Sequence, residues 1–277
     1  MRRRSAGFPA REAFSLLELL VAMGVLAFLL VMLSSFFGNI SNAWQFSRSK
    51  MDNFEKGRAL IQTVSRDLAA AVVRQDLPAF PSAASGRLDF YLRRYGQNTA
   101  TGSERPLTFV SYGVKNKNGQ WALVRTDAPY EFTNSPVTWE PFGNNSAVAG
   151  ANGVERILCS EVLAFSFHFI NADGSVSAAY RDASQAEPSV AIRVALAILD
   201  ERAAGILRES GSENQLLADL SVALPAGQTS YKANWDGALA GGQWTGKYPQ
   251  PVLAGLQTYE RVTPLPRSPL VLKEVLP

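Results

Sequence analysis

The longest uninterrupted run of hydrophobic positions lies near the N-terminus. Residues 14–37 are almost continuously apolar, and Glu18 is the one charged side chain among them. No further charge occurs before Arg48. A run of this length is typical of a membrane-spanning helix, which needs about 20 apolar residues. A carboxylate inside such a helix costs roughly 2.5–3.5 kcal/mol at the bilayer centre and less toward the surface, so we expect Glu18 to have a positively charged partner.

The helical periodicity continues beyond the apolar run. No proline between Pro9 and Pro78 interrupts a helix. Large apolar side chains recur at helical intervals and define one face: Trp44, Met51, Phe54, Ile61, Val64, Leu68 and Val72. We predict one helix from about residue 14 to about 74, roughly 90 Å long at 1.5 Å per residue. Residues 14–37 would be its transmembrane half, and residues 38–76 an amphipathic half that packs on a globular domain.

From residue 77 onward the periodicity changes from helical to β. Alternating segments predict strands at residues 88–93, 108–115, 121–126, 161–170, 175–180 and 191–199. Asn118-Gly119 predicts a hairpin, because both residue types tolerate positive φ. In the strand over 161–170 we expect one face to carry Leu163, Phe165, Phe167 and Phe169. Short helices are predicted at 200–208 and 212–222, which completes an α+β domain over residues 77–222.

Two segments lack periodicity. Residues 127–156 are rich in Asn, Pro, Gly and Ser, which predicts a long loop or insertion within the domain. Residues 223–277 contain seven prolines. For this Pro/Gly-rich C-terminal segment we expect an extended chain that lies on the domain, stiffened toward polyproline geometry by Pro264, Pro266 and Pro269.

Charge is concentrated ahead of the apolar run. The chain has a net charge of +3 over 277 residues, and four arginines precede residue 14: Arg2, Arg3, Arg4 and Arg11. By the positive-inside rule, this basic leader (residues 1–13) stays in the cytoplasm and the remainder lies outside. The nearly neutral remainder argues against a nucleic-acid surface, which requires clustered Lys and Arg.

Few residues suggest chemistry. Cys159 is the single cysteine, which excludes a disulfide framework and a multi-thiolate zinc site; we expect a small buried side chain, with an intermolecular bridge as the alternative. His168 is the single histidine and should point to solvent or to a second layer, opposite the Phe face. Residues 171–174 predict a turn rather than a calcium loop. We therefore predict no enzyme activity, no cofactor and no metal site, although a calcium site built from loops stays open.

The segment Ala13-Phe14-Ser15-Leu16-Leu17-Glu18 after a basic leader resembles the prepilin signal of type IV pilins and type II secretion pseudopilins. The resemblance implies cleavage by prepilin peptidase between Ala13 and Phe14 and N-methylation of Phe14. It also implies that Glu18, at the fifth mature position, neutralises the amino terminus of a neighbouring subunit during assembly. The residue before the cut is usually Gly, so Ala13 implies slower or peptidase-specific processing.

A second possible cleavage frame, Gly7-Phe8, also places an acid, Glu12, at the fifth position. Pro9 and Arg11 break the apolar pattern that has to follow such a cut. We therefore favour the cut after residue 13.

The order of the later segments is similar to that of J-type minor pseudopilins of type II secretion. The parallels are Ser65–Leu68, Leu88-Asp-Phe-Tyr, a hairpin ending in Leu123-Val-Arg125, Val162-Leu-Ala-Phe-Ser-Phe, and Pro188-Ser-Val-Ala-Ile-Arg. A closer resemblance is to the prepilin-like Verru/Chthon cassette protein C family, through the Ala-Phe-Ser start and Ala197–Ala204. Together the resemblances span about residues 11–210, and they imply a long helix packed on an antiparallel pilin-like β-domain.

The implied function is a structural subunit, a minor component of a type IV pilus-like or type II secretion-like pseudopilus. Its expected location is the bacterial inner membrane, as a single-pass protein with the C-terminal domain in the periplasm or outside the cell. The expected partners are prepilin peptidase, other pilin-like subunits and the membrane itself, but no nucleic acid. Two alternatives stay open: an uncleaved, membrane-anchored binding or adhesion domain, and an anchored enzyme.

Overall fold

The computed structural model describes residues 15–73, 80, 87–92, 96–97, 104–105, 108–129, 154–182, 184–222, 224 and 228–266. The chain divides into two compact units, residues 1–49 and 50–277. One helix, α1 (Leu16–Ala69), belongs to both, and its bounds confirm the predicted long helix to within a few residues. Antiparallel sheets follow in the second unit, so the predicted α+β class is confirmed.

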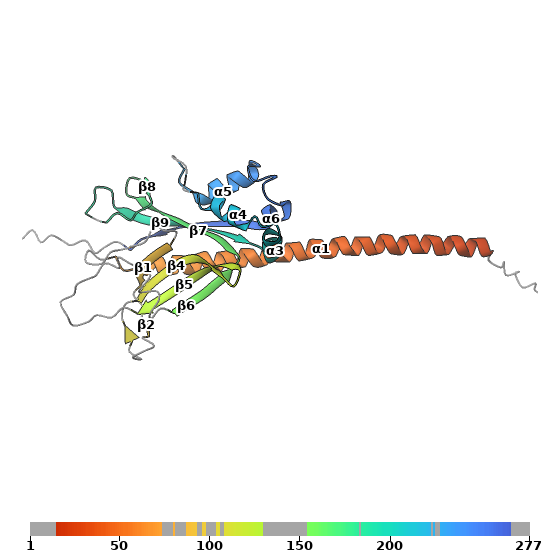
Figure 1. Ribbon diagram of the computed structural model, residues 1–277, viewed down its shortest axis with the longest axis horizontal. Coiled ribbons are helices and arrows are strands. Elements are labelled where there is room, and N and C mark those ends of the chain that lie inside the picture. The colour runs from red at the N-terminus through yellow and green to blue at the C-terminus, as the bar shows by residue number, and fades with distance from the viewer. Residues whose placement is uncertain are drawn as a thin grey trace, which may run out of the picture. The chain divides into compact units, whose positions relative to one another are not determined.

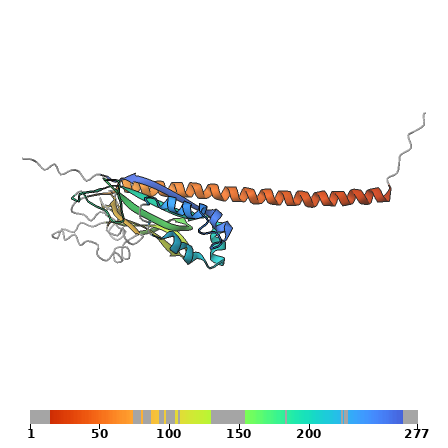
Figure 2. The same ribbon diagram turned by 90° about the horizontal axis from the view of Figure 1, so that it is seen from above.

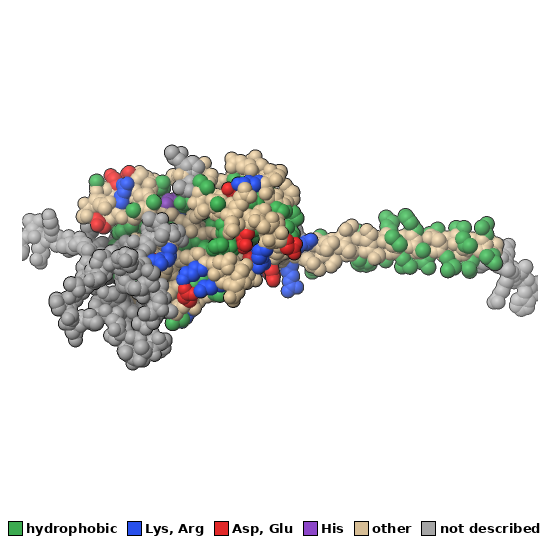
Figure 3. Space-filling view, viewed as in Figure 1, with side chains coloured by type: hydrophobic (Ala, Val, Ile, Leu, Met, Phe, Trp, Pro, Cys, Tyr) green, Lys and Arg blue, Asp and Glu red, His purple; other side chains and the backbone are tan. Residues whose placement is uncertain are grey.

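The described part of the first unit is mainly α1 up to Ser49. Its large apolar side chains, from Leu16 to Phe37, are all exposed, and Figure 3 shows hydrophobic side chains along the visible side of this part of the helix. Among the described residues, α1 is the one helix that is long and apolar enough to cross a bilayer. Its position near the N-terminus also fits a signal sequence.

The second unit contains two four-stranded antiparallel sheets and a two-stranded ribbon (Figure 1). The first sheet has the order β1-β4-β5-β6 and comprises β1 (Arg87–Leu92), β4 (Thr108–Lys117), β5 (Gln120–Pro129) and β6 (Val154–Ser160). The second has the order β10-β9-β7-β8 and comprises β10 (Leu256–Pro264), β9 (Ser189–Leu199), β7 (Val162–Asn171) and β8 (Val176–Ser177). The ribbon pairs β2 (Gly96–Gln97) with β3 (Glu104–Arg105).

One core lies between the C-terminal part of α1 and the two sheets. Leu60, Val64 and Leu68 of α1 are buried against Phe90 and Leu123 of the first sheet and side chains of the second sheet. Full burial of each such side chain contributes roughly 1.5–3 kcal/mol. This confirms that the later part of the amphipathic stripe faces a globular domain.

A second core lies on the other face of the second sheet. Four short helices cover that face (Figures 1 and 2): α3 (Glu201–Glu209), α4 (Glu213–Leu220), α5 (Tyr231–Ala240) and α6 (Gln250–Gly255). Trp235 of α5 is 1% exposed and donates its indole N–H to the Leu220 carbonyl at 3.1 Å. The two helices predicted at 200–208 and 212–222 are confirmed as α3 and α4.

The first three apolar side chains of the predicted amphipathic stripe are more than half exposed. Trp44, Met51 and Phe54 are 76%, 60% and 52% exposed. Helical periodicity indicates which side chains share a face, but it does not indicate how far along the helix a packing partner extends. In α1, burial of this stripe's apolar side chains begins near Leu60.

The prediction that Leu163 shares a face with the three phenylalanines of β7 is wrong. The register between β7 and β9 shifts between Val162 and Ala164. A β-bulge of this kind adds one residue and reverses the alternation of faces. Leu163 therefore packs in the second core, whereas Phe165, Phe167 and Phe169 pack in the first.

The expectation of an extended, polyproline-like segment over 223–277 is also wrong for the residues described. This segment forms α5, α6 and the nine-residue strand β10, which pairs antiparallel with β9 along its whole length. Each of these elements is short and buries only one face. Their apolar side chains therefore form no long periodic pattern in the sequence. Pro264 is the last residue of β10, while Pro269 lies outside the described residues.

The loop predictions are confirmed in part. Asn118 and Gly119 have φ angles of 54° and 80° and form the predicted hairpin between β4 and β5. The strand predicted over 175–180 is only Val176–Ser177. The predicted insertion over 127–156 is shorter at both ends, because β5 extends through Pro129 and β6 begins at Val154; residues 130–153 lie outside the described part.

Candidate assembly helix and its anchor in the domain

The residues predicted for processing and assembly lie at the start of α1. Ala13 and Phe14 fall outside the described residues. Glu18 is exposed in the first turn of α1. The Ser15 Oγ accepts a hydrogen bond from the backbone N–H of Glu18 at 3.2 Å. Ser-x-x-Glu is the spacing of a helix capping box, and in the structure the Ser15 side chain has the local role of capping the helix.

The Glu18 carboxylate stands on an apolar surface. Its neighbours Leu16, Leu17 and Leu19 are 83%, 73% and 58% exposed. Within the described residues, Glu18 forms no ion pair. A carboxylate near a helix N-terminus is favoured by the helix dipole, yet in an apolar medium it still needs a cation. The described part of α1 thus carries, in its first turn, an exposed carboxylate with no ion-pair partner among the described residues.

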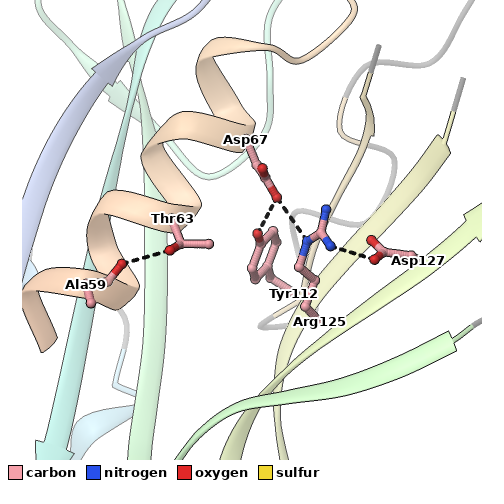
Figure 4. Close-up of polar contacts among 6 residues, drawn as sticks. All are labelled: Ala59, Thr63, Asp67, Tyr112, Arg125 and Asp127. Carbon is pink, nitrogen blue, oxygen red and sulfur yellow. Dashed lines mark hydrogen bonds and ion pairs between the residues drawn. The ribbon is translucent and has the colours of Figure 1, made fainter. Parts of the chain in front are cut away.

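A buried polar cluster anchors the other end of α1 to the first sheet (Figure 4). The Asp67 Oδ2 accepts hydrogen bonds from the Tyr112 hydroxyl at 2.6 Å and from the Arg125 Nε at 2.9 Å. The Arg125 Nη1 donates to the Asp127 Oδ2 at 2.5 Å. Arg125 extends from β5 and is only 6% exposed, so its charge is compensated by the two carboxylates rather than by water.

The cluster shifts the pKa of Tyr112 and the pKa of Arg125. Burial, together with the negative charge of Asp67, raises the pKa of Tyr112 far above its usual value. Burial opposes the charged form of Arg125, but Tyr112, Asp127 and Asp67 together raise its pKa. Tyr112 therefore remains a neutral donor and Arg125 a cation at any physiological pH. A structural joint between helix and sheet requires these fixed protonation states.

A second joint connects α1 to β10. The Tyr259 hydroxyl donates to the Asn53 carbonyl at 3.0 Å, and the Gln257 Nε2 donates to the Lys50 carbonyl at 3.3 Å. In Figure 2, β10 runs beside this part of α1. Burial raises the pKa of Tyr259 to about 12, so its hydroxyl also stays protonated.

His168 lies in the second layer, one of the two positions predicted for it. Its side chain is buried, its residue is opposite Arg193 in the β7–β9 ladder, and its ring lies 5.7 Å from that of Tyr231 on α5. Burial, with the positive charge of Arg193, lowers the pKa of His168 to about 4. It is therefore a neutral packing residue at pH 7.

The other candidates for chemistry have structural roles. Residues 171–174 form the predicted turn, in which the Asp173 Oδ1 accepts from the Ser175 N–H at 2.8 Å. Cys159 is a half-buried free thiol, and burial raises its pKa. Within the described part of the chain, no group of three or more His, Cys, Asp or Glu side chains is arranged to hold a metal ion.

The sequence analysis did not predict the contact between Asp67 and Arg125. Ser65–Leu68 and Leu123–Arg125 were singled out by resemblance, and the structure brings Asp67 and Arg125 of these segments together. They are 58 residues apart, so no local pattern links them. Comparison with protein-family models and with curated proteins finds no match to this chain. The long apolar N-terminal helix and the antiparallel sheets are consistent with a pilin-like architecture.

Proposed function

We propose that this protein is a prepilin-like structural subunit. In this proposal prepilin peptidase cuts between Ala13 and Phe14, Phe14 is methylated, and the mature chain joins a pilus-like or pseudopilus-like filament as a minor component. Before assembly, α1 spans the bacterial inner membrane and the domain lies in the periplasm or outside. The observation that carries the proposal is the exposed, apolar start of α1 with its single carboxylate, which has no ion-pair partner among the described residues.

The physical argument begins with the cost of Glu18. Leaving the bilayer exposes apolar surface to water, which is unfavourable for one helix alone. Packing against other apolar helices removes that surface, and an incoming protonated amino terminus removes the unpaired charge of Glu18. Removing one partner from an ion pair in apolar surroundings typically costs 3–5 kcal/mol. Assembly becomes favourable only when a neighbouring subunit supplies both the apolar surface and the cation.

The joints between α1 and the sheets suit this role. An assembling helix has to carry its domain with it, and the Asp67–Arg125 and Tyr259–Asn53 contacts hold α1 to both sheets. The domain also carries four short helices on the face of the second sheet that points away from α1. In a filament whose centre is made of α1 helices, that layer would face outward and favour a minor position rather than uniform polymerisation.

Glu18→Gln tests the assembly step, because it removes the charge with little change in size. We expect membrane insertion to be unchanged and co-purification with partner pilin-like subunits to fall more than about tenfold. Ser15→Ala is the matched control, since it removes the cap on α1 but leaves the carboxylate. Equal losses in both variants would attribute the effect to helix capping and would contradict the proposal.

The mass and N-terminal residue of the native protein test the processing step. We expect a chain that begins at N-methylated Phe14. An intact chain beginning at Met1 would instead favour the uncleaved, membrane-anchored binding or adhesion domain. A chain cut after the apolar run would indicate a secretory signal sequence and exclude a filament built on α1.

A further inference from the structure

A basic hollow lies between α1 and the edge strand β10. It has a volume of about 280 Å³. Its helix wall consists of Gln62, Ser65, Arg66 and Ala69, which share one face of α1 at intervals of three, one and three residues. Its strand wall is the segment Arg261–Pro264. No Asp or Glu is among these lining residues, so the hollow is positively charged.

Among the described residues, neither Arg66 nor Arg261 has an ion-pair partner, and both side chains are exposed. Elsewhere in the domain, several positively charged side chains of the strands form ion pairs. Lys115 and Lys117, for example, both pair with Glu155. Two unpaired guanidinium groups at one hollow are suited to bidentate recognition of carboxylates.

Two hydroxyl groups in the same walls are also unpartnered. Ser65 and Thr263 are 6% and 4% exposed, and the Ser65 Oγ and Thr263 Oγ1 make no hydrogen bond to any described residue. Buried hydroxyls almost always find a partner. The two hydroxyls thus add polar groups to the walls of the hollow.

The outer edge of β10 is open in the described part of the chain. β10 is the terminal strand of its sheet. At its two ends, the Leu265 N–H donates to the Val190 carbonyl at 3.0 Å and the Asp200 N–H donates to the Gly255 carbonyl at 3.2 Å. Hydrogen-bonded and non-hydrogen-bonded pairs alternate in an antiparallel ladder. Odd-numbered residues of β10 thus bond to β9, and the N–H and C=O of Thr258, Glu260 and Val262 point outward.

We infer that this edge binds an acidic peptide in extended conformation, which adds a strand to β10 and places carboxylates on Arg66 and Arg261. Outward N–H and C=O groups at alternate residues match the backbone of a strand, whereas a small anion would leave them unused. Alternate residues of a strand point to the same face of the sheet, so the Arg261 side chain lies on the same face as Gln257 and Tyr259, which contact α1. Alternate side chains of the added strand therefore face both arginines. This site goes beyond the proposed function and depends neither on processing nor on Glu18.

Fluorescence anisotropy with the full chain in dodecyl maltoside micelles tests the inference at low salt. The probe is a labelled Val-Glu-Val-Glu-Val-Glu-Val peptide, and its counterpart has Gln in place of each Glu. We expect the acidic peptide to bind at least about tenfold more tightly than the Gln peptide. Arg66→Gln and Arg261→Gln should each weaken binding about tenfold. Arg202→Gln, the matched control on α3, should leave it unchanged.

Two further measurements test strand addition itself. Val262→Pro removes one outward N–H without removing a bond to β9, and it should abolish binding. If that variant unfolds, two acidic peptides, one N-methylated at its Val residues and one at its Glu residues, probe the same bonds with the unaltered protein. Methylation of the set of N–H groups that faces β10 should abolish binding, so only one of the two peptides should bind. Equal binding of the Glu and Gln peptides, unchanged binding in the arginine variants, or full binding of both N-methylated peptides would overturn the inference.

Discussion

The ring of Tyr259 lies against the backbone of Gly57. A Cβ atom at position 57 would be 2.3 Å from the Tyr259 Cε2, far inside van der Waals contact. The hydroxyl of the same ring reaches the Asn53 carbonyl at 3.0 Å, one helical turn before Gly57. Glycine is required here by the close approach of β10 to α1, and not by its backbone conformation.

Gly57→Ala should therefore destabilise the domain despite the better helix propensity of alanine. Displacing a packed ring costs about 1–3 kcal/mol, and alanine recovers about 1 kcal/mol in a helix interior. We expect a net loss of about 1 kcal/mol in the free energy of unfolding, measured by urea titration in micelles. In a Tyr259→Ala background the ring is absent, so the same substitution should stabilise by about 1 kcal/mol. The same sign in both backgrounds would show that the ring and position 57 are not coupled.

Asp67→Asn should weaken the joint between α1 and the first sheet. The Asn side chain can still accept a hydrogen bond from Tyr112. The substitution removes, however, one of the two negative charges that compensate the buried Arg125. Loss of one partner from a buried ion pair typically costs about 3–5 kcal/mol; because Asp127 still compensates Arg125, we expect about 2–3 kcal/mol here. Urea unfolding of the full chain measures the change.

Asp52→Asn on the exposed surface of the same helix is the matched control for Asp67→Asn. It makes the same chemical change, and we expect an effect within about 0.5 kcal/mol. An equal effect at positions 52 and 67 would mean that net charge, and not the buried cluster, controls stability.

Trp235→Ala should show that the C-terminal segment is part of the folded core. Truncation of a fully buried aromatic side chain costs about 3–5 kcal/mol. Trp235→Phe keeps most of the volume but leaves the Leu220 carbonyl without its donor, for which we expect about 1–3 kcal/mol. Trp44→Phe, at a position that is 76% exposed, should change the free energy of unfolding by less than about 0.5 kcal/mol.

The elements of this fold that could be predicted are those with local signals. The run from residue 14 onward and the Asn118-Gly119 turn depend on neighbouring residues, and both predictions are confirmed. The side of β7 on which Leu163 lies depends on a bulge opposite β9, which no alternation within β7 reveals. Partners separated by 58 residues, such as Asp67 and Arg125, are likewise invisible to periodicity.

In the candidate functional regions, too, only the feature with a local signal in the sequence was predicted. The carboxylate at position 18 was found because a lone charge in an apolar run is a strong local signal. The hollow between α1 and β10 was missed because its strand lies in the segment that we expected to be extended and unpaired. Proline content suggested that expectation, but Pro264 ends β10 at a position where an N–H would point away from β9. A proline at such an edge position is compatible with a strand.

Acid should destabilise the domain through His168. Its pKa is about 4 in the folded chain and about 6.5 when unfolded. Between these values the unfolded chain binds a proton that the folded chain does not, so stability is lost as the pH falls from about 6.5 to 4. The loss is about 1.4 kcal/mol at pH 5.5 and about 3 kcal/mol near pH 4. His168→Phe should remove this component, and the carboxylates of both proteins titrate alike. Urea titrations of both proteins at pH 7, 5.5 and 4.5 measure the difference; parallel pH profiles would show that His168 takes up its proton equally in the folded and unfolded chains.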